Sequence, residues 1–151
     1  MIKKGDDVPK IELEFEDGKK IALHNLKKTI LYFYPKDDTP GCTTEACSFR
    51  DYNEDIRKSG WNIYGISKDT LESHDKFTKK YELNFSLLSD ADLEAARAFG
   101  AFGERSLYGK IFKGVLRTTF AVDSGKVLHV WEGVKPKEHA KEVFEWIKEN
   151  S

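Results

Sequence analysis

The sequence is poor in cysteine, and this scarcity narrows the classes of protein that it can represent. Its 151 residues include two cysteines, Cys42 and Cys47, whereas small secreted domains that depend on disulfides usually carry more. A structural zinc site normally needs four ligands. The four histidines stand singly, at His24, His74, His129 and His139. The sequence therefore predicts no metal site, and it favours a catalytic or redox role for the cysteine pair.

A long hydrophobic run and a charge excess of one sign are also missing. The longest strongly apolar run, residues 29–34, is far shorter than the roughly 18 residues that a membrane-spanning helix needs. Residues 1–7 include lysines, but no apolar stretch follows them, so no secretory signal is expected. The chain has 25 Lys and Arg against 26 Asp and Glu, a formal net charge of -1. We therefore expect a cytoplasmic protein with no nucleic-acid partner and no membrane partner.

The pattern that is present alternates between strands and helices. Residues 11–15 and 20–23 flank an Asp17-Gly18 turn and predict a hairpin. Residues 29–34 are a continuous run of β-forming residues, typical of a strand buried on both faces. Further strands are predicted at residues 61–66, 85–88, 116–122 and 127–131, and helices at residues 40–59, 71–81, 93–99 and 136–148.

This order of elements predicts the α/β class. Strands that alternate with helices favour a central sheet flanked by helices. Because a tight turn joins the last two strands, the sheet is expected to be mixed. We predict a single domain over residues 1–151, in which the glycine-punctuated residues 100–114 are a surface loop. The scattered histidines are expected at the surface or at strand ends.

The helix after the first buried strand begins with residues that matter chemically. Thr39 is placed to be the N-cap, Pro40 fits the first helical position, and Glu45 adds negative charge near the first turns. Cys42 then lies in the first turn, where unpaired N–H groups present roughly half a positive charge. That field favours a thiolate over a thiol. Open α/β sheets also place active sites at the carboxyl ends of strands, so Cys42 is the predicted nucleophile.

The spacing of Cys42 and Cys47 restricts their chemistry. In an ideal helix, Cα atoms at i and i+5 lie roughly 8.6 Å apart, whereas a disulfide needs less than about 7 Å. The sulfurs therefore cannot bond until the first turns unwind. Dithiol exchangers of the thioredoxin type place two residues between their cysteines. Four intervening residues favour a two-stage reaction, in which one sulfur first reacts with an oxidant.

Residues 33–47, Phe-Tyr-Pro-Lys-Asp-Asp-Thr-Pro-Gly-Cys-Thr-Thr-Glu-Ala-Cys, resemble the active-site segment of the peroxiredoxins. They are most similar to the peroxiredoxin Q branch, also called bacterioferritin comigratory protein. The family pattern Pro-x-x-x-Thr-x-x-Cys falls on Pro35, Thr39 and Cys42, and the second cysteine of the branch falls on Cys47. The resemblance covers essentially the whole chain, with further similar segments at residues 65–69, 87–90, 117–120 and 129–131.

The resemblance implies a thioredoxin-like fold with an N-terminal β-hairpin, and neither a metal nor an organic cofactor. It also implies a monomeric thiol-dependent peroxidase that reduces hydrogen peroxide and alkyl hydroperoxides. In the implied cycle Cys42 becomes a sulfenic acid. Cys47 attacks that acid, and an intramolecular disulfide results. Thioredoxin or a similar dithiol protein then reduces the disulfide.

The resemblance also implies roles for four further residues. Thr39 and Arg117, together with the helix N–H groups, hold the peroxide oxygens and stabilise the departing oxyanion. Pro35 and Gly41 contribute to the substrate-binding pocket. Without the resemblance, Arg117 would be interpreted as an ordinary surface ion-pair residue. Its position in the sequence does not show whether it contacts Cys42.

The residues are also consistent with other functions. A dithiol-disulfide exchanger or electron carrier uses the same kind of fold, although this chain lacks a Cys-x-x-Cys motif. A thiol sensor uses the same oxidation chemistry to change shape. A cysteine pair can also consist of two small buried hydrophobes without chemical function. Catalytic consumption of peroxide separates a peroxidase from all three.

Overall fold

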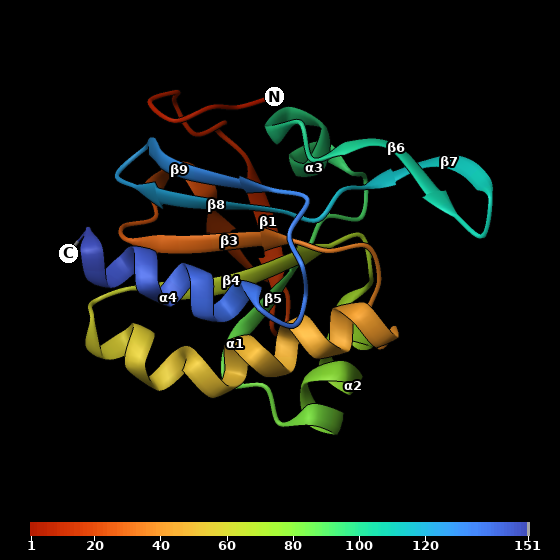
Figure 1. Cartoon of the computed structure of the whole chain (residues 1–151), viewed down its shortest axis with the longest axis horizontal. Coiled ribbons are helices and arrows are strands. Elements are labelled where there is room, and N and C mark those ends of the chain that lie inside the picture. Colours follow the sequence, from red (N-terminus) through yellow and green to blue (C-terminus); the bar gives the residue numbers. More distant parts are fainter. Residues whose placement is uncertain (151) are drawn as a thin grey trace.

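The computed structural model describes residues 1–150, and its elements follow the predicted alternation (Figure 1). The strands are β1 (Glu12–Phe15), β2 (Lys19–Ala22), β3 (Thr29–Phe33), β4 (Asn62–Ser67), β5 (Ser86–Ser89), β6 (Phe102–Leu107), β7 (Lys110–Val115), β8 (Thr118–Asp123) and β9 (Lys126–Glu132). The helices are α1 (Pro40–Lys58), α2 (Leu71–Tyr81), α3 (Glu94–Phe99) and α4 (His139–Glu149), with a 3-10 helix at Leu23–Asn25. Within residues 1–150, no helix is both long and apolar enough to cross a membrane.

Seven strands form one mixed sheet in the order β2-β1-β5-β4-β3-β8-β9. The interior strand β3 is parallel to β4 and antiparallel to β8, and β4 is parallel to β5. The N-terminal hairpin of β1 and β2 joins β5 through the pairing of Glu14 with Ser89. The predicted mixed sheet with an N-terminal hairpin is therefore confirmed. Because β3 is hydrogen-bonded to a strand on each side, both strands hold in place the end of β3, from which the chain leads into α1.

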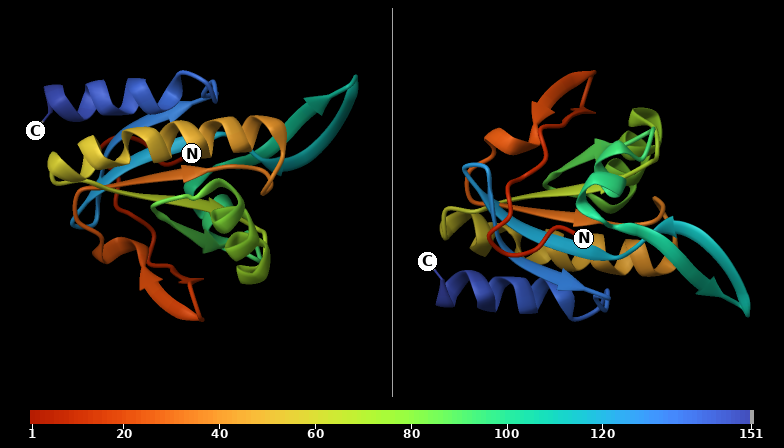
Figure 2. Two further views of the ribbon diagram at one scale, coloured as in Figure 1. Left: turned by 90° about the horizontal axis from the view of Figure 1, so that it is seen from below. Right: turned by 90° about the horizontal axis from the view of Figure 1, so that it is seen from above.

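Side chains of β3 are buried on both faces of the sheet, as its apolar run predicts. Ile30 and Tyr32 pack with residues of α1, α2 and α4, whereas Leu31 and Phe33 pack with α3 and the N-terminal segment. Figure 2 shows α1 and α4 together on one side of the central strands. The predicted inward face of α1 is also buried, at Cys42, Ala46, Phe49, Asn53 and Ile56. Cys42 therefore faces the sheet, not the solvent.

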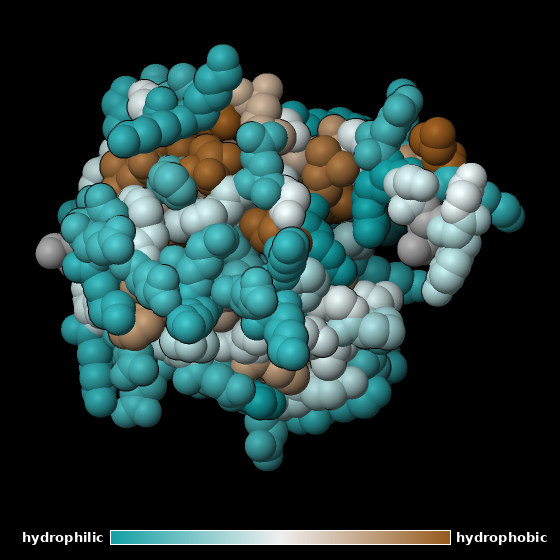
Figure 3. All heavy atoms as spheres, in the orientation of Figure 1, coloured by the Kyte–Doolittle hydropathy of each residue, from teal (hydrophilic) through white to brown (hydrophobic). Residues whose placement is uncertain are grey.

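Residues 100–114 are not the surface loop that the sequence predicts. Most of them form β6 and β7, a two-stranded hairpin separate from the main sheet. Its turn contains Tyr108 and Gly109, both with positive φ, at 51° and 78°, as a type I′ hairpin turn requires. Such turns usually carry Asn-Gly or Asp-Gly, so Tyr-Gly gives no turn signal. The hairpin projects from the body (Figure 1), and Figure 3 shows hydrophobic side chains at this end, where Ile111 is 72% exposed.

Two histidines are buried, although the sequence prediction places them at the surface or at strand ends. His74 lies in α2 and His139 begins α4. The ring nitrogens of His74 contact Asp37 and the carbonyl of Leu88, and His139 contacts the hydroxyl of Thr119. A buried polar ring needs such partners. Because these partners come from other elements of the fold, the local sequence around a single histidine does not reveal them.

Candidate active site

The loop between β3 and α1 carries the predicted site residue Thr39. It occupies the N-cap position of α1, and its carbonyl accepts the backbone N–H of Thr43 at 2.8 Å. The Thr39 hydroxyl does not cap the helix, because it donates to the carbonyl of Lys36 at 2.9 Å. The proton of this hydroxyl is therefore engaged in a hydrogen bond, whereas the lone pairs of the Thr39 oxygen can still accept a hydrogen bond from another donor.

Cys42 is the third residue of α1 and is only 1% exposed. The Nη2 atom of Arg117 lies 3.2 Å from its sulfur. Two sources of positive charge thus converge on this sulfur, the N-terminus of α1 and a guanidinium group. Both stabilise a negatively charged sulfur. The geometry therefore suits a thiolate nucleophile.

Gly41 explains how Arg117 comes so close. A Cβ at Gly41 would stand 2.6 Å from Nη2 of Arg117, so any larger residue would push the guanidinium away from Cys42. Pro35 is half-buried at the start of the same loop. The roles of Pro35 and Gly41 in peroxide binding stay predictions, while the clearance that Gly41 provides follows from its contacts.

Glu45 belongs to the site, although the sequence prediction treats it only as negative charge near the helix start. It lies beyond the first turn of α1 and is fully buried, with Oε1 3.2 Å from Nη1 of Arg117. Its Oε2 has no hydrogen-bond partner among residues 1–150. Burial raises the pKa of Glu45 to about 7, although Arg117 acts in the opposite direction. The spacing of Glu45 three residues after Cys42, which places both on one helical face, is the sequence signal that could have identified it.

Cys47 is on the same helix as Cys42 but apart from it. Both cysteines are free, with Cys42 buried and Cys47 half-buried. Because α1 is continuous over Pro40–Lys58, the ideal Cα separation of roughly 8.6 Å applies. The fold thus gathers Cys42, Arg117 and Glu45 beside the loop of Thr39, and it leaves Cys47 outside this group.

Similarity to known proteins covers nearly the whole chain. The AhpC/TSA family model matches residues 4–130. Peroxiredoxin Bcp of Escherichia coli (strain K12) is 40% identical, over 99% of this chain and 98% of that protein. Peroxiredoxin Bcp of Bacillus subtilis (strain 168) is also 40% identical, over 97% of this chain and 96% of that protein. This chain belongs to the AhpC/TSA family, in its peroxiredoxin Q (Bcp) branch.

The fold of this peroxiredoxin agrees with solved structures from the same branch. Bacterioferritin comigratory protein of Xanthomonas campestris, studied for its alkyl peroxide reduction activity, matches with a TM-score of 0.85 and 37% identity, over 93% of this chain and 91% of that chain. A cysteine-to-serine mutant of PrxQ from Xylella fastidiosa matches with a TM-score of 0.90 and 30% identity, over 99% and 98%. The predicted family and the predicted thioredoxin-like fold are both confirmed.

The activity follows from membership of this peroxiredoxin branch. The chain is an enzyme, a thiol-dependent peroxidase, that takes a peroxide as substrate and needs a reductant. In the part of the chain that the structure describes, no group of three or more His, Cys, Asp or Glu side chains is arranged to hold a metal ion. The reactive groups that the residues of this peroxiredoxin supply are its two thiols and the charged side chains beside Cys42.

Proposed function

We propose that Cys42 is the nucleophile that attacks the peroxide. Its thiolate forms an S–O bond with one peroxide oxygen while the O–O bond breaks. The departing oxygen takes a proton and leaves as water or an alcohol, and Cys42 becomes a sulfenic acid. The observation that supports this role best is the 3.2 Å contact between Cys42 Sγ and Arg117 Nη2. This contact places a fixed positive charge where the Cys42 thiolate is consumed and where negative charge forms on the departing oxygen.

Thr39 and Arg117 complete the peroxide site. Arg117 and the uncapped first-turn N–H groups of α1 stabilise negative charge on the departing oxygen. Because its own proton goes to Lys36, the Thr39 oxygen accepts the O–H of the hydroperoxide. Pro35 and Gly41 line the pocket, which admits both hydrogen peroxide and alkyl hydroperoxides.

Cys47 completes the second step. Its thiol attacks the sulfur of the Cys42 sulfenic acid, an S–S bond forms, the S–O bond breaks, and water leaves. The intact helix keeps the two sulfurs too far apart for this reaction. The first turns of α1 therefore unwind before the disulfide forms.

Thioredoxin or a similar dithiol protein restores the enzyme. Two thiols of the reductant become a disulfide, and Cys42 and Cys47 return to thiols. We place the enzyme in the cytoplasm and expect it to act as a monomer. A reducing cytoplasm is where a close cysteine pair stays available for repeated cycles.

Turnover with hydrogen peroxide, and separately with an alkyl hydroperoxide, tests this function. Thioredoxin, thioredoxin reductase and NADPH are supplied, and NADPH oxidation is followed. The wild-type enzyme is expected to consume many equivalents of peroxide per chain. Consumption that stops near one equivalent despite active thioredoxin would point to a sensor or to a different reductant. A second reductant, such as glutaredoxin with glutathione, separates those two outcomes.

A further inference from the structure

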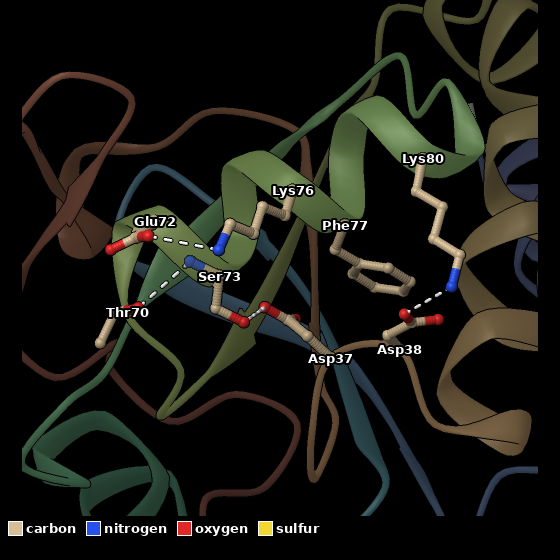
Figure 4. A pocket seen from close by; sticks show the side chains of 8 residues that line it. All are labelled: Asp37, Asp38, Thr70, Glu72, Ser73, Lys76, Phe77 and Lys80. Carbon is tan, nitrogen blue, oxygen red and sulfur yellow. Dashed lines mark hydrogen bonds and ion pairs between the residues drawn. The ribbon is translucent and has the colours of Figure 1, made fainter.

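A buried carboxylate connects the loop of Thr39 to helix α2. Asp37, only 7% exposed, accepts the hydroxyl of Tyr34 on Oδ1 at 2.6 Å and that of Ser73 on Oδ2 at 2.8 Å. Nδ1 of His74 lies 2.7 Å from the same Oδ2. Figure 4 shows Asp37 and Ser73 facing each other across the gap between the loop and α2. A carboxylate with three hydrogen-bonding partners, two of them buried, has a well-defined position.

Asp37 and His74 form a hydrogen bond between two buried side chains. Nε2 of His74 lies 3.0 Å from the carbonyl oxygen of Leu88, and a carbonyl only accepts, so Nε2 carries a proton. Nδ1 of His74 shares one hydrogen bond with Oδ2 of Asp37, so both ring nitrogens have partners inside the fold. Removing one partner would leave the other as a buried polar group without this hydrogen bond, and the free-energy cost of that loss keeps the two side chains together.

One peptide unit links Asp37 to the hydroxyl of Thr39. The N–H of Asp37 and the carbonyl of Lys36 belong to the same planar peptide. That N–H donates to Oδ2 of Asp69 at 2.9 Å, and that carbonyl accepts the Thr39 hydroxyl at 2.9 Å. The contacts that orient Asp37 therefore also orient the acceptor of the Thr39 proton. They decide in which direction the lone pairs of the Thr39 oxygen point.

The residue between Asp37 and Thr39 is also held in place by contacts with α2. Asp38 has a φ of 54°, which is uncommon for a residue other than glycine. Its carboxylate accepts from Lys80 and from the hydroxyl of Tyr81, each at 2.8 Å. Figure 4 shows Lys80 reaching from α2 to Asp38. The loop is thus attached to α2 at two consecutive residues just before Thr39.

We propose that Asp37 is a positioning residue of the peroxidase site and acts through Thr39. Its buried contacts orient the Lys36 carbonyl, which takes the Thr39 proton and directs the Thr39 lone pairs at the incoming hydroperoxide. Asp37 does not touch the substrate. The inference rests on the proposed role of Thr39 in binding peroxide. When the contacts of Asp37 weaken, Thr39 loses its alignment, whereas the pair of Cys42 and Arg117 stays in place.

A double-mutant cycle tests this inference. Tyr34→Phe removes one hydrogen bond to Asp37 without leaving an unpaired charge. The rate constant for oxidation of Cys42 by hydrogen peroxide, measured in a single turnover, is expected to fall about threefold to tenfold. In a Thr39→Val background the same substitution is expected to cause no further loss, because both changes act on one contact. The rate at which a dithiol reductant opens the disulfide is expected to stay unchanged.

Matched variants control for loss of a buried hydroxyl and for changes in α2. Tyr32→Phe also removes a buried tyrosine hydroxyl, one with no hydrogen-bond partner among residues 1–150, and is expected to leave the peroxide rate unchanged. Ser73→Ala tests the same carboxylate from α2 if Tyr34→Phe does not fold. Lys76→Ala is its control, because Lys76 lines the same gap but pairs with an exposed glutamate.

The outcomes separate this inference from the proposed function. An equal loss with and without the Thr39 hydroxyl, or no loss in Tyr34→Phe and Ser73→Ala, means that Asp37 does not act through Thr39. In both cases wild-type turnover persists, so the peroxidase function stands. A wild-type enzyme without peroxide turnover overturns the proposed function instead.

Discussion

Nη2 of Arg117 lies 3.2 Å from the sulfur of Cys42, although 75 positions separate the two residues in the sequence. The antiparallel pairing of β3 with β8 produces this contact. It places Thr118, the first residue of β8, opposite Phe33, the last residue of β3. Arg117 precedes Thr118, and the chain that follows Phe33 leads into α1. The sheet therefore brings a cation to the N-terminus of the helix that carries Cys42.

Replacing Cys42 by serine is expected to reduce peroxide turnover to background. A serine hydroxyl is a much weaker nucleophile than a thiolate at neutral pH. Steady-state assays with thioredoxin measure the loss, and circular dichroism verifies that the variant is folded. Turnover clearly above background in the folded Cys42→Ser protein would refute the assignment of the nucleophile.

Replacing Cys47 by serine is expected to permit one turnover and then stop. Cys42 can still become a sulfenic acid, but no second thiol on the helix attacks it. One equivalent of peroxide should be consumed per chain, and a dimedone-type probe should label Cys42, as mass spectrometry can show. Continued turnover with thioredoxin alone would mean that the cycle does not need Cys47.

Replacing Arg117 by lysine is expected to slow the reaction with peroxide by about a hundredfold. Lysine keeps a positive charge, but it lacks the planar group with which Arg117 reaches Cys42 and Glu45 together. Stopped-flow measurements give the rates of oxidation by peroxide and of reduction by the dithiol separately. Arg97→Lys, on α3, is the matched control. Equal losses in both steps of Arg117→Lys would indicate a structural role.

Replacing Glu45 by glutamine is expected to change how stability depends on pH. Burial raises the folded-state pKa of Glu45 from about 4.5 to about 7, so the folded state binds this proton more tightly than the unfolded state does. The stability from the protonated carboxyl is complete below about pH 4.5 and is lost as the pH rises through about 7. That loss is up to about 3 kcal/mol.

Urea unfolding of the reduced proteins between pH 4.5 and pH 8 measures this effect. Glutamine stays neutral, so Glu45→Gln should lack the part of the decline that comes from Glu45. Glu54→Gln removes a highly exposed carboxylate from the same helix and should follow the wild type. Parallel stability curves for Glu45→Gln and the wild type would contradict the raised pKa.

Oxidation is expected to unwind the start of α1 while the sheet stays intact. Amides of residues 43–49 should lose protection from hydrogen exchange when the Cys42–Cys47 disulfide forms, because the intact helix keeps these sulfurs apart. Amides of residues 30–33 should stay protected. The disulfide closes a small loop, so it should add little global stability. Helical amides that stay protected in a protein proven to carry this disulfide would exclude local unwinding.

Most of the fold can be predicted from local patterns. The apolar run of β3, the alternation in β1 and the one-sided burial of α1 each follow from the periodicity of nearby residues. The hairpin of β6 and β7 could not be predicted in this way, and the cause lies in its turn. Its turn carries Tyr108 before Gly109 in place of the usual asparagine or aspartate, so the sequence lacks the usual turn signal.

By itself, the sequence determined that Cys42 lies in the first turn of a helix after a buried strand, and that Cys47 lies too far along that helix to bond to it. Both facts depend on residues within a few positions of each other. Only the tertiary structure decided that Arg117 contacts Cys42, that Glu45 is buried beside it, and that Asp37 pairs with His74. Such contacts depend on strand register and helix packing, because these alone determine which distant residues share the low-dielectric interior where charge acts most strongly.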